Sequence, residues 1–418
     1  MEKLVITGGV PLRGSVEISG AKNSVLAILA GTLLVNGKCR IENIPDISDV
    51  SVILEMIECF GAKIERPDIH TIIVDAENIE YAVPDYELVR RIRGSYYLIG
   101  ALLSRFRKAE IAMPGGCNFG TRPIDQHIKG FTALGADIDD SRGVIKATAE
   151  NLIGASIYLD KVSVGATINI MLAACKAEGL TVIENAAREP HIVDMANFLN
   201  AMGANIKGAG TNRVKIMGVT DMKGGTYQII PDQIEAGTFM IAAAATKGDV
   251  LVKNIIPKHM ESLTAKLIEV GAKITELDDA IRVEGTDSLK ATNVQTMPYP
   301  GFPTDLQPQM VALLTIAEGL SVMVEGVWDN RFQYTDELIR MGAKINASGK
   351  MATIQSVSSL YGAPVKATDL RGGAAVVIAG LMAEGVTEVS NISLIDRGYE
   401  KFEEKLRTLG AKIERVEE

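Results

Sequence analysis

The chain is poor in aromatic side chains, which make up 5% of its residues and include a single Trp. Its cores must therefore be built mainly from aliphatic residues. Cysteine and histidine are also scarce, with four residues of each type, and no two Cys form a CxxC pair. The His residues show no paired spacing of metal ligands, so we expect neither a zinc site nor a disulfide framework. These residues are Cys39, Cys59, Cys117 and Cys175, and His70, His127, His191 and His259.

Long apolar segments are also missing. Apolar runs such as 240–245 are far too short to span a bilayer, and the first residues do not resemble a secretory signal. The chain has no GxxxxGK[ST] loop and no GxGxxG after a strand, which argues against the nucleotide sites built on those loops. Its formal charge of −9 argues against a nucleic-acid partner. We expect a soluble, cytoplasmic protein without metal, nucleic acid or membrane insertion.

What the sequence does contain is an internal repeat. Its 418 residues are enough for roughly two to three domains. A Gly-Ala-x-Ile tetrad occurs six times, and successive tetrads are 74, 68, 68, 71 and 68 residues apart. So steady a period indicates six copies of one structural unit. The tetrads begin at Gly61, Gly135, Gly203, Gly271, Gly342 and Gly410.

The segments around each tetrad predict the fold. An amphipathic segment such as 51–60 precedes each tetrad, and a Gly directly after it is typical of a left-handed helix cap. The Ile of the tetrad then opens a strand. Further upstream lies an almost wholly apolar segment, such as 25–30, 97–103, 168–174 or 374–381, which predicts a buried helix. We expect an α/β fold of two inside-out domains, each of three repeated helix–strand units, with buried helices and outer sheets.

One loop is notable for its chemistry. Residues 113–122 read Met-Pro-Gly-Gly-Cys-Asn-Phe-Gly-Thr-Arg, and three Gly with a Pro cannot continue a helix or a strand. Cys117 lies five residues before Arg122, whose charge would stabilise a thiolate. The pattern predicts a reactive thiol, and the alternative is a small turn with an incidental Cys.

Basic residues recur where a helix or a short loop is expected to begin. Helix N-termini have free N–H groups, and an adjacent cation makes them anion sites. Repeats place equivalent positions at equivalent edges, so these cations would converge on a cleft suited to a substrate with phosphate and carboxylate groups. Each cation taken alone has the alternative of a solvated or capping charge. The residues are Lys22, Arg93, Arg122, Lys161, Arg331, Arg371 and Arg397.

Three titratable residues have two interpretations each. Asp305, in Phe-Pro-Thr-Asp before a buried helix, is either a helix cap or a general base facing the anion cleft. Asp369, two residues before Arg371, is either a cap or part of the site. His127 either lines the same cleft or lies on a helix surface.

Collected together, these residues resemble those of the enolpyruvyl transferases. The resemblance extends along the whole chain, through Gly-Ala-Lys-Asn-Ser at 20–24, Pro-Gly-Gly-Cys at 114–117, Phe-Pro-Thr-Asp at 302–305 and Arg-Gly-Gly at 371–373. It implies two domains between which the chain crosses twice. One domain would consist of residues 1–20 with 230–418, and the other of residues 21–229 with the Cys117 loop.

The resemblance also implies an activity and a role for each residue. An enolpyruvyl group would pass from phosphoenolpyruvate to the 3′-hydroxyl of UDP-N-acetylglucosamine by addition and elimination, with release of phosphate and without a cofactor. The implied catalytic residues are Cys117 (proton donor and fosfomycin target), Asp305 (base), Lys22, Arg397 and Asp369. Lys22, Arg122 and Arg397 would bind the phosphate, and Arg331 and Arg371 the carboxylate. The sugar nucleotide would be bound by Asn23, Arg93, Arg122, Pro123, Ile124, Asp125, Gln126, Ser163, Val164, Asp305 and Val327.

Three rival functions remain open at this point. The same chemistry on shikimate 3-phosphate is the first, and Cys117 argues against it because that enzyme uses no loop Cys. A catalytically silent paralogue that binds a UDP-sugar and regulates a partner is the second, and the intact catalytic set argues against it. A repeat scaffold without a ligand would leave the cations at helix starts unexplained. The sequence does not predict the oligomeric state.

Overall fold

The computed structural model describes residues 2–113 and 124–417. The predictions for Cys117, Arg122 and Pro123 fall outside the described residues. The chain divides into two compact units. The first unit consists of residues 2–19 and 231–417, and the second of residues 20–113 and 124–230.

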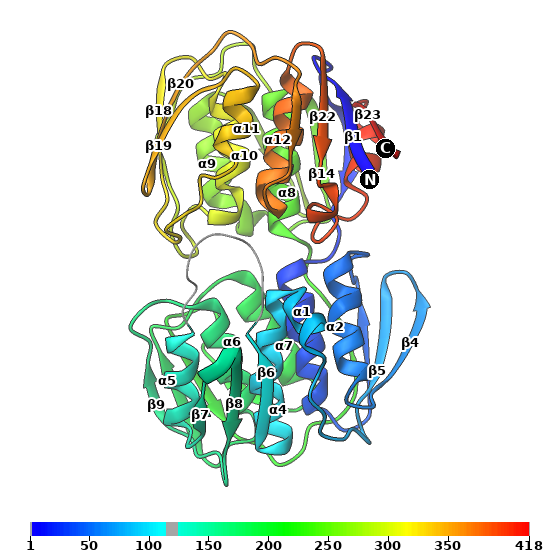
Figure 1. The fold of residues 1–418 in the computed structure, drawn as a ribbon, viewed down its shortest axis with the longest axis vertical. Coiled ribbons are helices and arrows are strands. Elements are labelled where there is room, and N and C mark those ends of the chain that lie inside the picture. Colours follow the sequence, from blue (N-terminus) through cyan, green and yellow to red (C-terminus); the bar gives the residue numbers. More distant parts are fainter. Residues whose placement is uncertain (1, 114–123, 418) are drawn as a thin grey trace. The chain divides into compact units, whose positions relative to one another are not determined.

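The second unit has three buried helices surrounded by three sheets. Helices α1 (Lys22–Gly31), α4 (Tyr97–Phe106) and α6 (Val164–Ala174) pack against one another at its centre (Figure 1). The sheets have the orders β13-β3-β5-β4, β6-β8-β7 and β11-β12-β10-β9. Their strands, in chain order, are β3 (Lys38–Glu42), β4 (Lys63–Asp68), β5 (Thr71–Asp75), β6 (Lys108–Ala112), β7 (Asp137–Asp139), β8 (Val144–Thr148), β9 (Ser156–Tyr158), β10 (Leu180–Glu184), β11 (Asn205–Lys207), β12 (Arg213–Met217) and β13 (Thr226–Gln228). The remaining helices are α2 (Ser48–Glu58), α3 (Tyr86–Arg90), α5 (Asp125–Ala133) and α7 (Pro190–Ala201), with 3₁₀ helices η1 (Thr32–Leu34), η2 (Arg93–Tyr96) and η3 (Ser141–Gly143).

The first unit repeats this plan. Its buried helices are α8 (Gln233–Ala245), α10 (Gln307–Leu314) and α12 (Leu370–Met382), with the strands at the sides of the unit in Figure 1. The sheet orders are β21-β22-β1-β23, β15-β16-β14-β2 and β17-β18-β20-β19. The strands are β1 (Glu2–Thr7), β2 (Arg13–Glu17), β14 (Asp249–Lys253), β15 (Lys273–Glu276), β16 (Ala280–Glu284), β17 (Val294–Gln295), β18 (Leu320–Val324), β19 (Lys344–Ser348), β20 (Met351–Gln355), β21 (Pro364–Lys366), β22 (Val386–Ser390) and β23 (Lys412–Glu417). The other helices are α9 (Glu261–Val270), α11 (Thr335–Arg340), α13 (Phe402–Thr408), η4 (Pro257–Met260), η5 (Thr304–Leu306) and η6 (Ile392–Leu394).

The α/β fold with buried helices and outer sheets is confirmed. In α12, every residue from Leu370 to Leu381 is buried, as its apolar sequence predicts. The six tetrad glycines all adopt positive φ, between 87° and 109°, and each follows a helix. Only Gly takes this left-handed conformation without strain, which explains why the tetrad begins with it.

The structure adds strands that the sequence pattern did not reveal. In five of the six repeats the strand opened by the tetrad Ile is the first arm of a hairpin, as in β4–β5, and a further strand joins most sheets in parallel, as β13 does beside β3. These extra strands are only two to five residues long, too short for an alternating pattern to be recognised. Strand β1 lies between β22 and β23, which ties the start of the chain to its end.

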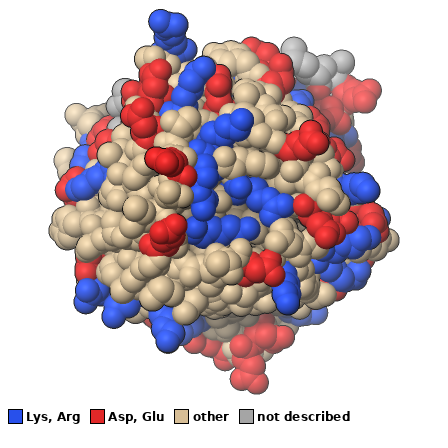
Figure 2. All heavy atoms as spheres, turned by 90° about the horizontal axis from the view of Figure 1, so that it is seen from below, with Lys and Arg blue, Asp and Glu red and all other residues tan. Residues whose placement is uncertain are grey.

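The surface carries charges of both signs. On the face drawn in Figure 2, Lys and Arg side chains gather near the middle, and Asp and Glu lie around them. Within residues 2–113 and 124–417, no helix has the length and apolar character needed to cross a membrane.

Candidate active site

The predicted base of the first unit is held by two buried arginines. Arg371 donates to Asp305 Oδ2 from Nε at 3.3 Å and from Nη2 at 3.2 Å. Arg331 Nη2 lies 3.5 Å from the other carboxylate oxygen. The side chains of both arginines are almost fully buried, whereas that of Asp305 is 30% exposed. The carboxylate thus presents an open edge to solvent while two guanidinium groups stabilise its negative charge.

The start of α12 explains the position of Arg371. Asp369 is the N-cap of this helix, and its Oδ1 accepts from the backbone N–H groups of Arg371 at 2.9 Å and Gly372 at 3.1 Å. Arg371 therefore lies inside the first turn of α12 and not before it. The capping interpretation of Asp369 is confirmed. Asp305 caps neither η5 nor α10, because the capping positions of both helices lie at other residues and carry no side-chain bond.

Arg371 also contacts a buried polar network. Its guanidinium lies 5.2 Å from the ring centre of Tyr399, a distance that favours a cation–π contact. The Tyr399 hydroxyl lies 2.9 Å from Thr238 Oγ1, and Gln309 Nε2 donates to the Tyr399 hydroxyl at 3.1 Å. Burial raises the pKa of Tyr399, so the phenol stays protonated. The orientation of Arg371 is thereby set by groups on two further buried helices, α8 and α10.

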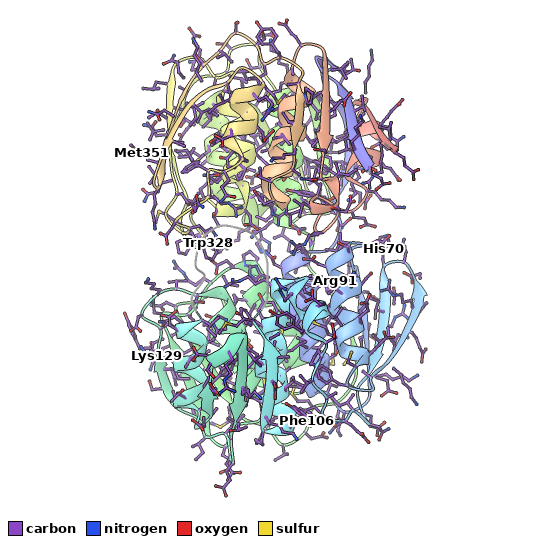
Figure 3. The ribbon with its side chains drawn as sticks, viewed as in Figure 1. His70, Arg91, Phe106, Lys129, Trp328 and Met351 are labelled. Atoms are coloured by element: carbon purple, nitrogen blue, oxygen red, sulfur yellow. The ribbon has the colours of Figure 1, made fainter. Side chains whose placement is uncertain are left out.

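The loop after β18 carries Val327 and Arg331. Val327 is exposed, and its N–H donates to Glu325 Oε1 at 2.9 Å. Trp328, which Figure 3 labels, donates to the same oxygen from its backbone at 3.1 Å. Arg331 Nη2 donates to the Thr304 carbonyl at 3.4 Å, directly before Asp305. Arg397 is half-buried in the segment between η6 and α13, one residue after Asp396, which binds Arg415 at 2.7 Å.

In the second unit, Lys22 forms a buried ion pair. Lys22 is the first residue of α1, and its Nζ lies 2.9 Å from Asp49 Oδ2 in the first turn of α2. The side chains are 13% and 3% exposed. Asn23 follows Lys22 in the same turn and is half-buried. Asp49 was not predicted from the sequence, because nothing in a single chain marks which carboxylate pairs with a given Lys.

Arg93 and Ser163 begin the other two buried helical segments of this unit. Arg93 opens η2, and its guanidinium lies 5.5 Å from the ring centre of Tyr96. Ser163 is the N-cap of α6, where its Oγ accepts from Ala166 N–H at 3.2 Å, and Val164 is the first residue of this helix. Lys161, two residues earlier, is exposed. The prediction that basic residues accompany helix starts is confirmed for Lys22 and Arg93.

Residues 124–126 open α5. Ile124 is the N-cap and Asp125 the first helical residue. Gln126 is buried and joins α5 to the segment before α6, because its Oε1 accepts from the Asp160 N–H at 2.8 Å. Lys129, labelled in Figure 3, adds an ion pair to the Asp160 side chain at 2.8 Å. These contacts fix the helix that follows residues 114–123.

His127 is buried, so the interpretation as a helix-surface His is wrong. Its side chain packs near Tyr96, with 6.0 Å between the ring centres, and the Cα of Gly165 is so close that a Cβ there would lie 2.8 Å from His127 Nε2. Burial, followed by the charge of Arg93, lowers the pKa of His127 to about 4. The ring is therefore neutral at physiological pH. The sequence misled here because α5 is amphipathic and its apolar side includes this His.

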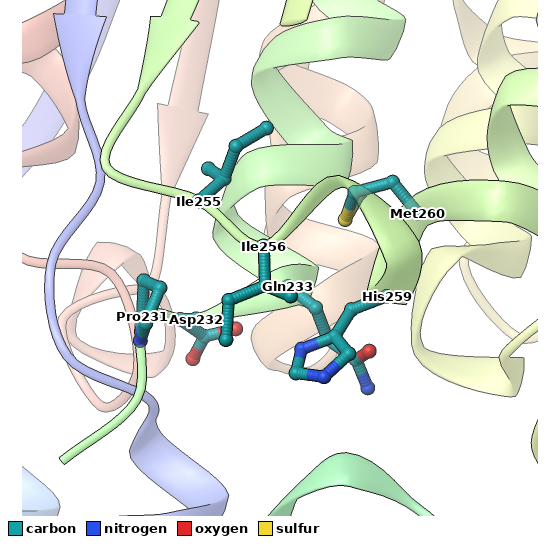
Figure 4. Close-up of a pocket in the computed structure, with 7 residues that line it drawn as sticks. All are labelled: Pro231, Asp232, Gln233, Ile255, Ile256, His259 and Met260. Atoms are coloured by element: carbon teal, nitrogen blue, oxygen red, sulfur yellow. The ribbon is translucent and has the colours of Figure 1, made fainter. Parts of the chain in front are cut away.

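The first unit also contains a small pocket. Pro231, Asp232, Gln233 and His259 are among the residues that line it at the start of α8 (Figure 4). Asp232 is the N-cap of α8, and its carboxylate accepts from the N–H groups of Ile234 and Glu235. None of the predicted site residues lines this pocket. Over the described parts of the chain, no three His, Cys, Asp or Glu side chains gather as metal ligands would.

Comparison with known proteins gives one consistent result. A family model described as EPSP synthase (3-phosphoshikimate 1-carboxyvinyltransferase) matches residues 6–406. UDP-N-acetylglucosamine 1-carboxyvinyltransferase 3 of Caldanaerobacter subterraneus subsp. tengcongensis is 58% identical, and the match covers all of both chains. UDP-N-acetylglucosamine 1-carboxyvinyltransferase of Clostridium botulinum is 55% identical, again over all of both chains.

Solved structures extend the likeness to the fold. The enolpyruvyl transferase NikO from Streptomyces tendae superposes with a TM-score of 0.90 at 26% identity, over 99% of each chain. EPSP synthase from Acinetobacter baumannii superposes with a TM-score of 0.77 at 19% identity, over all of both chains. The second likeness concerns the fold alone.

Proposed function

The chain belongs to the EPSP synthase family of enolpyruvyl transferases, and we propose that it transfers the enolpyruvyl group of phosphoenolpyruvate to the 3′-hydroxyl of UDP-N-acetylglucosamine. Phosphate is the second product. The observation that carries the proposal is the Asp305 carboxylate held by Arg371 and Arg331, which combines a base with two buried cations. The names of the relatives at 50–58% identity support the choice of the acceptor.

The charged residues take roles that follow from their chemistry. Arg331 and Arg371 bind the carboxylate of phosphoenolpyruvate, because guanidinium groups match a carboxylate with paired hydrogen bonds. Lys22, Arg122 and Arg397 bind its phosphate. Asp369 acts on the site through the α12 N-terminus that it caps, and so through the backbone position of Arg371.

The reaction proceeds by addition and elimination. Asp305 takes the proton of the 3′-hydroxyl as the hydroxyl oxygen bonds to C2 of phosphoenolpyruvate. Cys117 gives a proton to C3. The Cys117 thiolate formed in this step then takes a proton from C3 of the tetrahedral product as the bond between C2 and the phosphate oxygen breaks, and the proton held by Asp305 leaves with the phosphate. The cation cluster stabilises the charge of the departing phosphate throughout.

The sugar nucleotide is the second ligand of this proposal. Its contacts are assigned to the helix starts and loops described above, and include Arg122 and Pro123 outside the described residues. The full set is Asn23, Arg93, Arg122, Pro123, Ile124, Asp125, Gln126, Ser163, Val164, Asp305 and Val327. We further propose that the two compact units are the two domains of the enzyme, and that its product enters peptidoglycan precursor synthesis in the cytoplasm.

The test is release of phosphate from phosphoenolpyruvate with each of two acceptors, UDP-N-acetylglucosamine and shikimate 3-phosphate. We expect release with the first acceptor only, and a fall of about 10²–10⁴ in rate for Cys117→Ala. Fosfomycin should inactivate the wild type and leave the residual rate of the variant unchanged. Release with shikimate 3-phosphate would reassign the substrate. Binding of UDP-N-acetylglucosamine without any release would identify a silent paralogue.

A further inference from the structure

Glu325 is a buried carboxylate that collects four hydrogen bonds. It directly follows β18 and is 1% exposed. Its Oε1 accepts from Thr296 Oγ1 at 2.8 Å and from the N–H groups of Val327 at 2.9 Å and Trp328 at 3.1 Å. Its Oε2 accepts from Thr304 Oγ1 at 3.0 Å. All four donors are neutral groups, and the side chain of Glu325 is the acceptor in every one of these bonds.

These bonds join three separate segments. Thr296 follows β17, Thr304 is the first residue of η5, and Val327 begins the loop that leads to Arg331. Thr296 strengthens the junction, because its Oγ1 also accepts from the Gly326 N–H at 2.8 Å. Glu325 therefore fastens the turn that carries Asp305 to the loop that carries Val327.

The other repeats show that the scaffold itself does not require a Glu here. In four of the six repeats the residue directly after the corresponding strand is an Asn with φ between 54° and 59°, at positions 43, 185, 254 and 391. Three of these Asn side chains donate to a backbone carbonyl of a neighbouring segment, at 2.7–2.9 Å. In these three repeats the Asn side chain thus links the end of the strand to a neighbouring segment by a hydrogen bond.

Two repeats depart from the rule, with Met113 after β6 and Glu325 after β18. In sequence, Met113 is followed by the segment with Cys117, and Glu325 by the loop with Val327 and Arg331. Burying a carboxylate is costly, and local departures from a repeated structural solution concentrate at functional sites. The departure at 325 thus coincides with the repeat that carries the proposed base.

We propose that Glu325 is a positioning residue for Asp305. By binding Thr304 Oγ1 it sets the turn in which Asp305 meets the guanidinium groups of Arg371 and Arg331, and by binding the Val327 and Trp328 N–H groups it sets the adjacent loop. This inference rests on the proposed function, because it assigns Glu325 to the same reaction. Small displacements of a positioned catalytic group cost about 10²-fold in rate.

The test uses Glu325→Gln, Thr304→Val and Thr304→Ser, with Asn254→Gly as the matched control. Asn254 is the residue at the same repeat position in the same unit, and its substitution also removes one bond between segments. We expect kcat to fall about 10- to 100-fold in Glu325→Gln and Thr304→Val, with KM for phosphoenolpyruvate changed less than threefold. Thr304→Ser keeps the donor and should fall less than Thr304→Val. Asn254→Gly also removes a bond between segments, at a left-handed position that Gly adopts without strain, so its kcat should stay within twofold of the wild type.

A second readout does not depend on activity. Trp328 is the only Trp of the chain, and its backbone N–H donates to Glu325, so its fluorescence anisotropy reports the order of this loop. Anisotropy should fall in Glu325→Gln and be unchanged in Asn254→Gly. Equal losses of kcat in Glu325→Gln and Asn254→Gly would overturn the inference while leaving the proposed function intact. A wild-type kcat in Glu325→Gln would do the same. If the wild type releases no phosphate with UDP-N-acetylglucosamine, the proposed function fails and the assignment of Glu325 to this reaction fails with it. An unchanged anisotropy in Glu325→Gln would separately overturn the claim that Glu325 orders the loop.

Discussion

Arg371 holds Asp305 with two hydrogen bonds, from Nε at 3.3 Å and Nη2 at 3.2 Å, across 66 residues of sequence. The proposed base is thus bound to the group proposed to receive the substrate carboxylate. The two carboxylates, one from the protein and one from phosphoenolpyruvate, compete for the same guanidinium charge. Binding and turnover should therefore respond in opposite directions to the loss of the Asp305 charge.

Asp305→Asn is expected to separate these two effects. Its kcat should fall about 10²–10⁴-fold, because an amide cannot accept the hydroxyl proton. Its affinity for phosphoenolpyruvate should be equal to or higher than that of the wild type, because the competing negative charge is gone. Calorimetric titration and steady-state kinetics measure the two quantities. A variant that binds phosphoenolpyruvate more weakly and turns over within tenfold of the wild type would refute both roles.

The Lys22–Asp49 pair gives a second prediction. Lys22→Met should destabilise the protein by about 3 kcal/mol, because it leaves the Asp49 carboxylate buried without its cation. Adding Asp49→Asn to this variant should restore most of the stability and none of the phosphate release from phosphoenolpyruvate. Urea unfolding and phosphate release measure these outcomes. Recovery of activity together with stability would show that Lys22 has only a structural role.

The partly buried Lys176 predicts that an apolar substitution at this position stabilises the protein by an amount that depends on pH. Burial, followed by the charge of Arg105, lowers its pKa to about 8. Lys176 lies three residues before a Gly of positive φ, and the same position in two repeats of the other unit holds Ile316 and Met382. The fold therefore accepts an apolar side chain at this position. Below pH 8 this Lys is protonated in both the folded and the unfolded chain, so the folded protein carries the full cost of the buried charge.

Lys176→Met should therefore stabilise the protein at pH 7, by about 1–2 kcal/mol once solvent screening at this partly exposed site is allowed for. Between pH 8 and 10.5 the folded wild type releases the proton that the unfolded chain still binds, so wild-type stability rises and the advantage of the variant shrinks. Denaturant unfolding at pH 7 and pH 10 measures the difference. An advantage that does not depend on pH would attribute the gain to apolar packing alone.

His127 gives a prediction about stability at acidic pH. Its pKa of about 4 in the folded chain lies below its ordinary value of 6.5, so the unfolded chain binds the proton first as the pH falls. Wild-type stability should drop by about 3 kcal/mol between pH 6.5 and pH 4 from this group. His127→Leu should remove that part of the slope. If both proteins lose stability equally over this range, the His127 ring is not the buried neutral group described here.

Local patterns were enough to predict the fold class. The tetrad glycines and the apolar helices were recognised because a cap and a buried helix are both recorded in a few neighbouring residues. The second strands of the hairpins were missed because they are short, and the parallel strands because they are short and some pair with segments far away in sequence. Strand β2, for example, pairs with β14 across more than 200 residues.

The residues of the candidate site also divide into those that a local pattern marks and those that depend on packing. Residue types at helix starts predicted Lys22, Arg93 and Arg371, but their partners depend on packing. Asp49 and Glu325 carry no local mark of their contacts with Lys22 and Thr304. Glu325 had one available signal, since alignment of the six repeats places it where four others have Asn. His127 was misjudged because a buried neutral His and an exposed one occupy the same position of a helical pattern.

The most direct test of the account is a competition between the two acceptors. Wild-type protein is given phosphoenolpyruvate with equal concentrations of UDP-N-acetylglucosamine and shikimate 3-phosphate, and the products are identified by mass and by ³¹P resonance. We predict enolpyruvyl-UDP-N-acetylglucosamine as the only new ester or ether, with one phosphate released for each molecule formed. Formation of enolpyruvylshikimate 3-phosphate, or phosphate release without either product, would contradict the proposed function.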